Sequence, residues 1–185
     1  MKMNEWIKTR ITSRALSGPL VTLLTVAFFM VAGLPASAQT SSDVFGQVIE
    51  HYEKAYRSLT QDSIDDVPQA GEHIVKLLAA LEADFSAEKA GIDESAAASI
   101  RELLPELKKA GAQLAAAGDL TTARDAFYAL SKPLVRWRKA AASEDRPVVA
   151  YCSMTRRSWL QPEGETIANP YHGQSMLRCG EVVDR

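Results

Sequence analysis

The sequence lacks most of the motifs that catalysis would require. Its 185 residues include two cysteines and three histidines, without a Cys-x-x-Cys pair or a Gly-rich phosphate loop. The missing Cys-x-x-Cys argues against a zinc knuckle, a thioredoxin-type redox pair and c-type haem attachment. None of the three histidines belongs to a Ser–His–Asp catalytic signature. The missing Gly-rich loop argues against a phosphate-loop nucleotide site. We therefore do not expect an enzyme.

Long apolar runs are also scarce, except for one at the N-terminus. Leu20 to Leu34 is an uncharged run of fifteen residues, preceded by four basic residues and followed by the small-x-small sequence Ala36-Ser37-Ala38. A helix that crosses a bilayer needs about 20 residues. We therefore predict that residues 1–38 are a cleaved signal peptide, with an uncleaved anchor as the alternative. The expected location of the mature chain is outside the cytoplasm.

Clustered positive charge is absent from the remaining chain. The formal net charge is −2, and residues 1–38 carry a net +3, so the mature chain stands at −5. The basic stretches RWRK (136–139) and Arg156-Arg157 are short, and we interpret them as solvated surface. Phosphate binding depends on clustered Lys and Arg. We expect neither nucleic acid as a partner nor stable membrane insertion of the mature chain.

Residues 43–142 are rich in Ala, Leu, Glu and Lys, and their apolar residues recur at helical spacing. The pattern predicts four helices, over about 43–60, 62–85, 93–117 and 120–137. Asp43 and Asp119 are the expected N-caps, and Pro68 should lie in a first turn. Pro105 should kink or divide its helix, and Pro133 should bend its helix. The predicted fold is mainly α, an antiparallel four-helix bundle that serves as scaffold.

His51 and His73 fall on different predicted helices. Neither has a second metal-ligating side chain at i+3 or i+4 on its own helix. No inward Glu and Glu-x-x-His set of the di-iron type is present either. We interpret both histidines as isolated surface or packing residues.

Residues 146–185 lose the helical period and gain Pro, Gly, Asn, Trp and Tyr. PVVAYC (147–152) and MLRCGEVV (176–183) have the β-branched character of short strands. Turn signals lie between them at 162–164 and 169–173. The prediction is a small C-terminal β/turn module, packed on the helical bundle.

This module holds both cysteines. Cys152 and Met154 form one short pair, Met176 and Cys179 form another, and His172 lies near the second. Thiolate and thioether sulfurs favour Cu(I), which imidazole also suits. On an extended strand, Cys-x-Met places both side chains on one face. If the two strands are neighbours, the four sulfurs converge on a soft, low-coordinate metal site.

A disulfide is the alternative. Exported proteins with two cysteines often form one bridge. A Cys152–Cys179 bond would close a loop of about 28 residues and contribute roughly 3–4 kcal/mol. In that case Met154 and Met176 would be packing residues. The spacing alone leaves both interpretations open, with a structural or protein-interaction module as the second function.

The same residues resemble a known family signature, that of the DUF3347 family. The matching positions are Cys152, Met154, Trp159-Leu160-Gln161, Ile167, Asn169-Pro170-Tyr171, Gly173, Met176-Leu177 and Cys179-Gly180. Members occur as exported proteins and as a terminal domain of CusB-like periplasmic adaptor subunits of heavy-metal efflux pumps. Two positions depart from the usual pattern: Ser153 replaces a proline, and His172 replaces an aromatic residue.

The resemblance implies a periplasmic protein of copper, silver or related metal handling. The implied ligands are Cys152, Met154, Met176 and Cys179, and the implied partner is an efflux component or a metallochaperone. His172 could add a nitrogen ligand or only fill the place of a packed ring. Trp159, Leu160 and Tyr171 are expected to hold the strands against the helices, and Asn169 and Gly173 to form turns.

Overall fold

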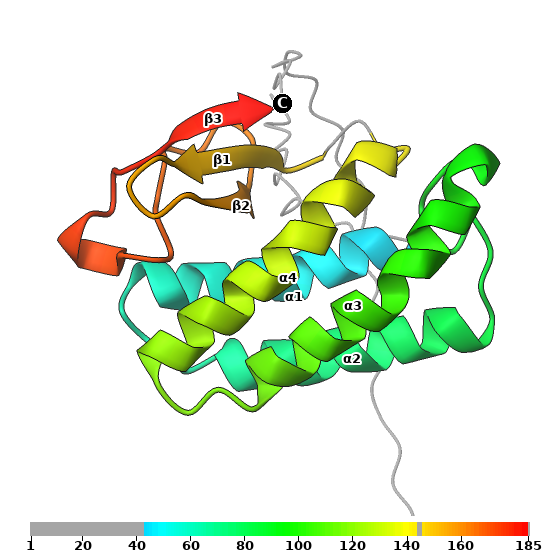
Figure 1. Cartoon of the computed structure of the whole chain (residues 1–185), viewed down its shortest axis with the longest axis horizontal. Helices are drawn as coiled ribbons and strands as arrows, with labels where there is room; N and C mark the ends of the chain where they lie inside the picture. Colours follow the sequence, from blue (N-terminus) through cyan, green and yellow to red (C-terminus); the bar gives the residue numbers. More distant parts are fainter. Residues whose placement is uncertain (1–42, 144–145, 185) are drawn as a thin grey trace, which may run out of the picture. The chain divides into compact units, whose positions relative to one another are not determined.

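The computed structural model describes residues 43–143 and 146–184 (Figure 1). The predicted signal peptide, residues 1–38, lies outside this range. The described chain begins with four helices and ends with a small sheet. Figure 1 shows the three strands beside α1 and α4.

The helices fall close to their predicted positions. They are α1 (Val44–Thr60), α2 (Val67–Ala83), α3 (Ala97–Ala115) and α4 (Leu120–Ala140), with a 3₁₀ turn η1 (Glu94–Ala96) before α3. The second prediction started too early, because the chain makes turns before α2. Pro68 lies in the first turn of α2, as expected. Neither Pro105 nor Pro133 divides its helix.

Both predicted N-caps are confirmed. The Asp43 carboxylate accepts a hydrogen bond from the Gly46 N–H at 2.8 Å. The Asp119 carboxylate accepts from Thr121 N–H at 2.8 Å and from Thr122 N–H at 3.0 Å. Each cap satisfies backbone donors that have no partner within the helix. These caps explain where α1 and α4 begin.

The helices bury their apolar faces against one another. α1 packs on α2 and α4, and α3 packs on α2 and α4. Gly71 of α2 lies against the backbone of α3, so that a Cβ added there would be only 2.4 Å from the Ala115 nitrogen. The glycine therefore allows the two helices to approach closely. The core residues of the helices include Val48, Tyr52, Leu59, Ile74, Leu78, Leu107, Leu114, Phe127, Leu134 and Trp137.

The sheet has three antiparallel strands in the order β2-β1-β3. β1 (Val148–Cys152) confirms the strand predicted for PVVAYC. β3 (Glu181–Asp184) is shorter than the strand predicted at 176–183, because the chain makes a 3₁₀ turn, η2 (Gly173–Ser175), and further turns before it. β2 (Arg157–Gln161) was not predicted as a strand. Its sequence, RSWLQ, does not alternate apolar and polar residues, so the strand pattern is missing.

A buried hydroxyl network fastens the sheet to the helices. Tyr52 of α1 and Ser131 of α4 hydrogen-bond at 2.7 Å, and the Tyr52 hydroxyl accepts from the Leu160 N–H at 3.1 Å. The Tyr171 hydroxyl donates to the Ser158 carbonyl at 2.6 Å. Buried polar groups that are satisfied in this way specify one packing arrangement. Trp159, Leu160 and Tyr171 are buried in the common core, which confirms their predicted packing role.

A buried arginine forms a second link between helix and sheet. Arg138 of α4 is 2% exposed, and its Nε–H donates to the Pro147 carbonyl at 2.7 Å. Its guanidinium also lies 3.2 Å from the carboxylate of Asp184, the last residue of β3. RWRK was interpreted as solvated surface, and for this residue that interpretation is wrong. The charge is buried because a carboxylate and a carbonyl compensate it.

Within residues 43–143 and 146–184, no helix is long and apolar enough to cross a membrane.

Candidate functional site

The two cysteines meet at the end of the sheet. Cys152 is the last residue of β1 and is buried, whereas Cys179 lies two residues before β3 and is half-buried. The antiparallel register pairs Tyr151 of β1 with Glu181 of β3. Cys152 follows Tyr151, and Cys179 precedes Glu181 by two residues, so both cysteines lie at the same end of the sheet. Both cysteines are free, and each thiol lies close enough to shift the pKa of the other. The two cysteines therefore lie near each other, and the wider convergence of four sulfurs stays a prediction.

The two thiols differ in acidity. Burial by itself raises the pKa of Cys152, but hydrogen bonds from Cys179, Thr155 and Met154 outweigh it and leave that pKa below its ordinary value. The hydrogen bond shared with Cys152 raises the pKa of Cys179, and burial adds to the increase. Cys152 is therefore the thiol that first forms a thiolate, the form that binds metals and attacks disulfides.

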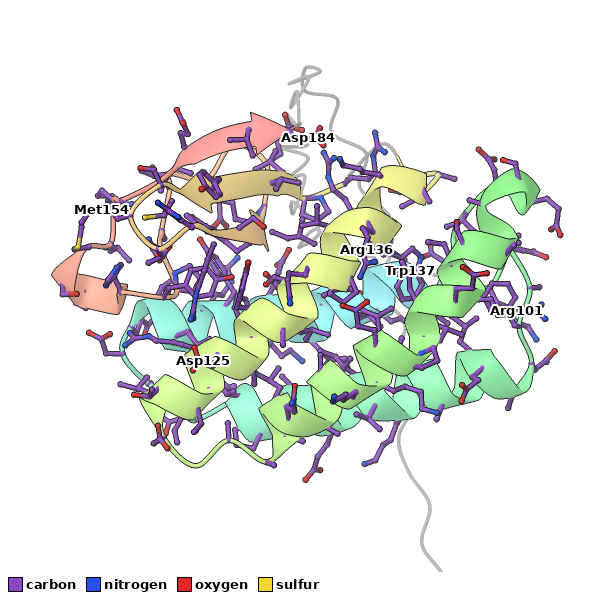
Figure 2. The ribbon with its side chains drawn as sticks, in the orientation of Figure 1. Arg101, Asp125, Arg136, Trp137, Met154 and Asp184 are labelled. Carbon is purple, nitrogen blue, oxygen red and sulfur yellow. The ribbon has the colours of Figure 1, made fainter. Side chains whose placement is uncertain are left out.

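The predicted methionine ligands flank the thiol pair through their backbones. The Met154 backbone amide lowers the pKa of both thiols, and the Met176 carbonyl accepts from the Cys179 N–H at 2.9 Å. The Met154 side chain is 68% exposed, and Figure 2 shows it at the outer edge of the module. Met154 does not share a strand face with Cys152, because β1 ends at Cys152 and a turn follows.

His172 lies in a different environment. It lines a shallow polar cleft of about 330 Å³ together with Arg124, Asp125 and Arg157. In the part of the chain that the structure describes, no three His, Cys, Asp or Glu side chains are grouped so that they could hold a metal ion. His172 thus forms no such group with the two cysteines. This finding concerns His, Cys, Asp and Glu side chains and does not include the thioethers of Met154 and Met176.

Asn169 holds the loop that carries Cys179. This buried amide donates to the Cys179 carbonyl at 2.8 Å and accepts from the Tyr171 N–H at 2.8 Å, while its own backbone N–H donates to the Leu177 carbonyl at 2.8 Å. Its predicted role as a turn former was thus only part of its function. The Asn-Pro-Tyr sequence was the available signal, since Asn commonly bonds to nearby backbone in turns.

Two glycines allow this loop to pack closely. Gly180 has φ +146°, and a Cβ there would lie 2.5 Å from the Trp159 ring. Gly173 has φ +52°, and a Cβ there would overlap the Asp62 carboxylate. Only glycine adopts such backbone conformations without strain. The loop therefore rests directly on β2 and on the end of α1, which positions Cys179 beside Cys152.

The interpretation of the other two histidines as isolated residues is wrong. The rings of His51 in α1 and His73 in α2 have their centroids 4.5 Å apart, with an interplanar angle of 51°. Spacing within each helix could not reveal this pair, because it depends on how α1 and α2 rotate against each other.

No known protein-family model matches the chain, and neither does any curated protein or solved structure. The resemblance to the DUF3347 family therefore depends on the motif residues alone and stays a prediction.

Proposed function

We propose that this chain is a periplasmic protein that binds a soft metal ion, Cu(I) or Ag(I), for metal homeostasis or efflux. The observation that supports this most directly is the proximity of the free thiols of Cys152 and Cys179, which shift each other's pKa. Two adjacent thiolates form a soft, low-coordinate site that selects Cu(I) over hard cations. The metal is cargo in this proposal, and the protein binds and transfers it without chemical turnover.

The thioethers complete the proposed ligand set. Met154 lies two residues after Cys152, and the Met176 carbonyl accepts from the Cys179 N–H, so both thioethers belong to the segments that carry the thiols. The exposure of Met154 suits a donor that receives the ion from solution or from another protein. His172 is the least supported ligand, because it lines the arginine-containing cleft.

The remaining parts of the proposal concern the scaffold and the location. We propose that the four helices form an antiparallel bundle, supported by the finding that each helix packs on two others. The N-terminal segment 1–38 supports export to the periplasm. A periplasmic efflux component or a metallochaperone is the proposed partner, as in the DUF3347 family that the motif resembles.

The test is a competition titration of the reduced apoprotein with Cu(I), in the absence of oxygen, against a coloured Cu(I) chelator. We expect one ion per chain. Cys152→Ser and Cys179→Ser should each weaken binding by far more than about tenfold, a loss that even second-layer residues can cause. Met154→Leu and Met176→Leu should cause smaller losses. Ser153→Ala is the control, because its hydroxyl is not among the proposed ligands.

The proposal fails if the double variant Cys152→Ser/Cys179→Ser binds Cu(I) as tightly as the unmodified chain. Circular dichroism of each variant shows whether the helices remain folded. Loss of binding without loss of helix content locates the effect in the thiols.

A disulfide between the same cysteines is the second candidate, and the same proximity favours it. In an oxidising compartment two adjacent thiols can pair. The bond would then hold the module closed, and the protein would act as a structural or interaction module without metal. Alkylation before and after reduction, followed by intact-mass measurement, separates the two. Labelling of both thiols without reductant contradicts the disulfide, and labelling only after reduction supports it.

A further inference from the structure

The His51–His73 pair lies on elements that the proposed copper site does not use. His51 belongs to α1 and His73 to α2, and both side chains are partly exposed at the contact between these helices. Their ring centroids are 4.5 Å apart. Two imidazoles from different helices are thus held together by the packing of α1 on α2.

One nitrogen of this pair has no partner. The Nδ1 atom of His51 is buried and makes no hydrogen bond with any residue in the described ranges. Buried polar atoms are nearly always paired, so an unpaired one calls for an explanation, such as a bound ion. A ring nitrogen with an unused lone pair is a ligand position.

The protonation state suits a ligand. Burial lowers the pKa of His51 below its ordinary value, and the positive charge of Lys54 and the proximity of His73 lower it further, against an opposing effect of Glu50. Neutral imidazole is the form that binds metals. Near neutral pH His51 therefore favours the neutral form, in which one of its two ring nitrogens has a free lone pair.

The spacing of the rings also fits. With metal–nitrogen bonds of about 2.0–2.1 Å, two imidazoles on one ion have centroids roughly 4.5–5.2 Å apart, for ligand angles from square-planar to tetrahedral. The observed 4.5 Å lies at the lower end of this interval. The separation of the two rings is therefore compatible with a shared ion.

We propose that His51 and His73 form a two-histidine site for a divalent transition-metal ion of the Cu²⁺, Ni²⁺ or Zn²⁺ class. Imidazole is a favoured ligand of all three. No third His, Cys, Asp or Glu side chain within the described ranges completes a metal-binding group with them, so water or small anions fill the other positions. The bound ion is therefore exchangeable. The site is independent of the proposed Cu(I) site, which uses sulfur ligands of the C-terminal module.

The test uses Cu²⁺ with the Cys152→Ser/Cys179→Ser chain, in which no thiol can reduce or bind the ion. We expect one Cu²⁺ per chain with nitrogen hyperfine structure from two imidazoles in the electron paramagnetic resonance spectrum. His51→Gln and His73→Gln should each weaken binding by at least about tenfold. His172→Gln is the matched control, because it removes the third histidine of the chain and should leave affinity and spectrum unchanged.

A second measurement addresses variants that fold poorly. Zn²⁺ should raise the thermal midpoint of the same Cys-free chain, since an ion that binds only the folded state stabilises it. The increase should disappear in His73→Gln and persist in His172→Gln.

The proposal is overturned if His172→Gln loses as much affinity as His51→Gln, or if the His51→Gln/His73→Gln double variant still binds Cu²⁺ as the parent does. Neither result affects the Cu(I) titration, which depends on the cysteines. The two proposals can therefore fail separately.

Discussion

Gly71→Ala should destabilise the protein strongly, although alanine is the better helix former. A Cβ at this position would lie 2.4 Å from the Ala115 backbone nitrogen and 2.8 Å from both the Ala115 Cα and the Gly111 carbonyl oxygen. These are backbone atoms of α3 and cannot rotate away. The substitution therefore forces α2 and α3 apart along their contact.

The expected magnitude follows from two opposing effects. Overpacking of this kind costs about 1–3 kcal/mol and occasionally more. The gain in helix propensity from Gly to Ala returns about 0.5–1 kcal/mol. Because the clash involves rigid backbone, we place its cost near the upper end, which leaves a net loss of about 2 kcal/mol. In a domain of this size the thermal midpoint should fall by about 4–8 °C.

Two other glycines provide a graded comparison. At Gly111, an added Cβ would first meet the Val75 side chain at 3.1 Å, which can adjust by a few tenths of an ångström. At Gly118 it would meet nothing within 4 Å, and the backbone there is not left-handed. We therefore expect Gly118→Ala to stay within about 0.5 kcal/mol of the unmodified chain, and Gly111→Ala to fall between the two.

Urea unfolding followed by circular dichroism measures the three variants on one scale. A shift of the midpoint at constant slope reports a change in stability. If Gly71→Ala unfolds at the same urea concentration as Gly118→Ala, α2 and α3 do not approach at Gly71, and the packing argument is refuted.

Three further outcomes can be checked on the same chain. Burial raises the pKa of Tyr56 to about 12, and its buried hydroxyl has no hydrogen-bond partner among the residues that the structure describes. Between pH 10 and 12 the unfolded state loses this proton while the folded state keeps it, so stability falls as pH rises. At pH 11 the unmodified chain should have lost about 1.4 kcal/mol more than Tyr56→Phe, relative to pH 8, in urea unfolding. Asn169→Ala should cost about 1–3 kcal/mol, because it leaves buried backbone groups unpaired, and should weaken Cu(I) binding in the chelator competition; unchanged binding would show that the loop does not position Cys179. Ser131→Ala should cost about 1–3 kcal/mol, because it removes the partner of the buried Tyr52 hydroxyl, and a Tm equal to that of the parent would contradict the hydroxyl network.

The local features of the fold could be predicted because they depend on neighbours in sequence. The apolar face of α1 and the caps at Asp43 and Asp119 depend on residues at most a few positions apart, so the sequence pattern predicts them. The β-branched residues of β1 likewise predict a strand from the local sequence alone. β2 was missed because its strand conformation depends on pairing with β1 and on burial against α1 and α4, as in the Leu160–Tyr52 hydrogen bond.

The candidate sites divide in the same way. Composition and spacing alone identified a C-terminal module that concentrates the sulfur-containing residues, because those residues lie within thirty positions. Which of them touch was decided by tertiary structure. The β1–β3 register brings Cys152 to Cys179, and the end of β1 at Cys152 turns Met154 outward. The His51–His73 pair required the docking of α1 on α2. A helix period determines which face is apolar, but only the packed partner determines which polar side chains meet across it.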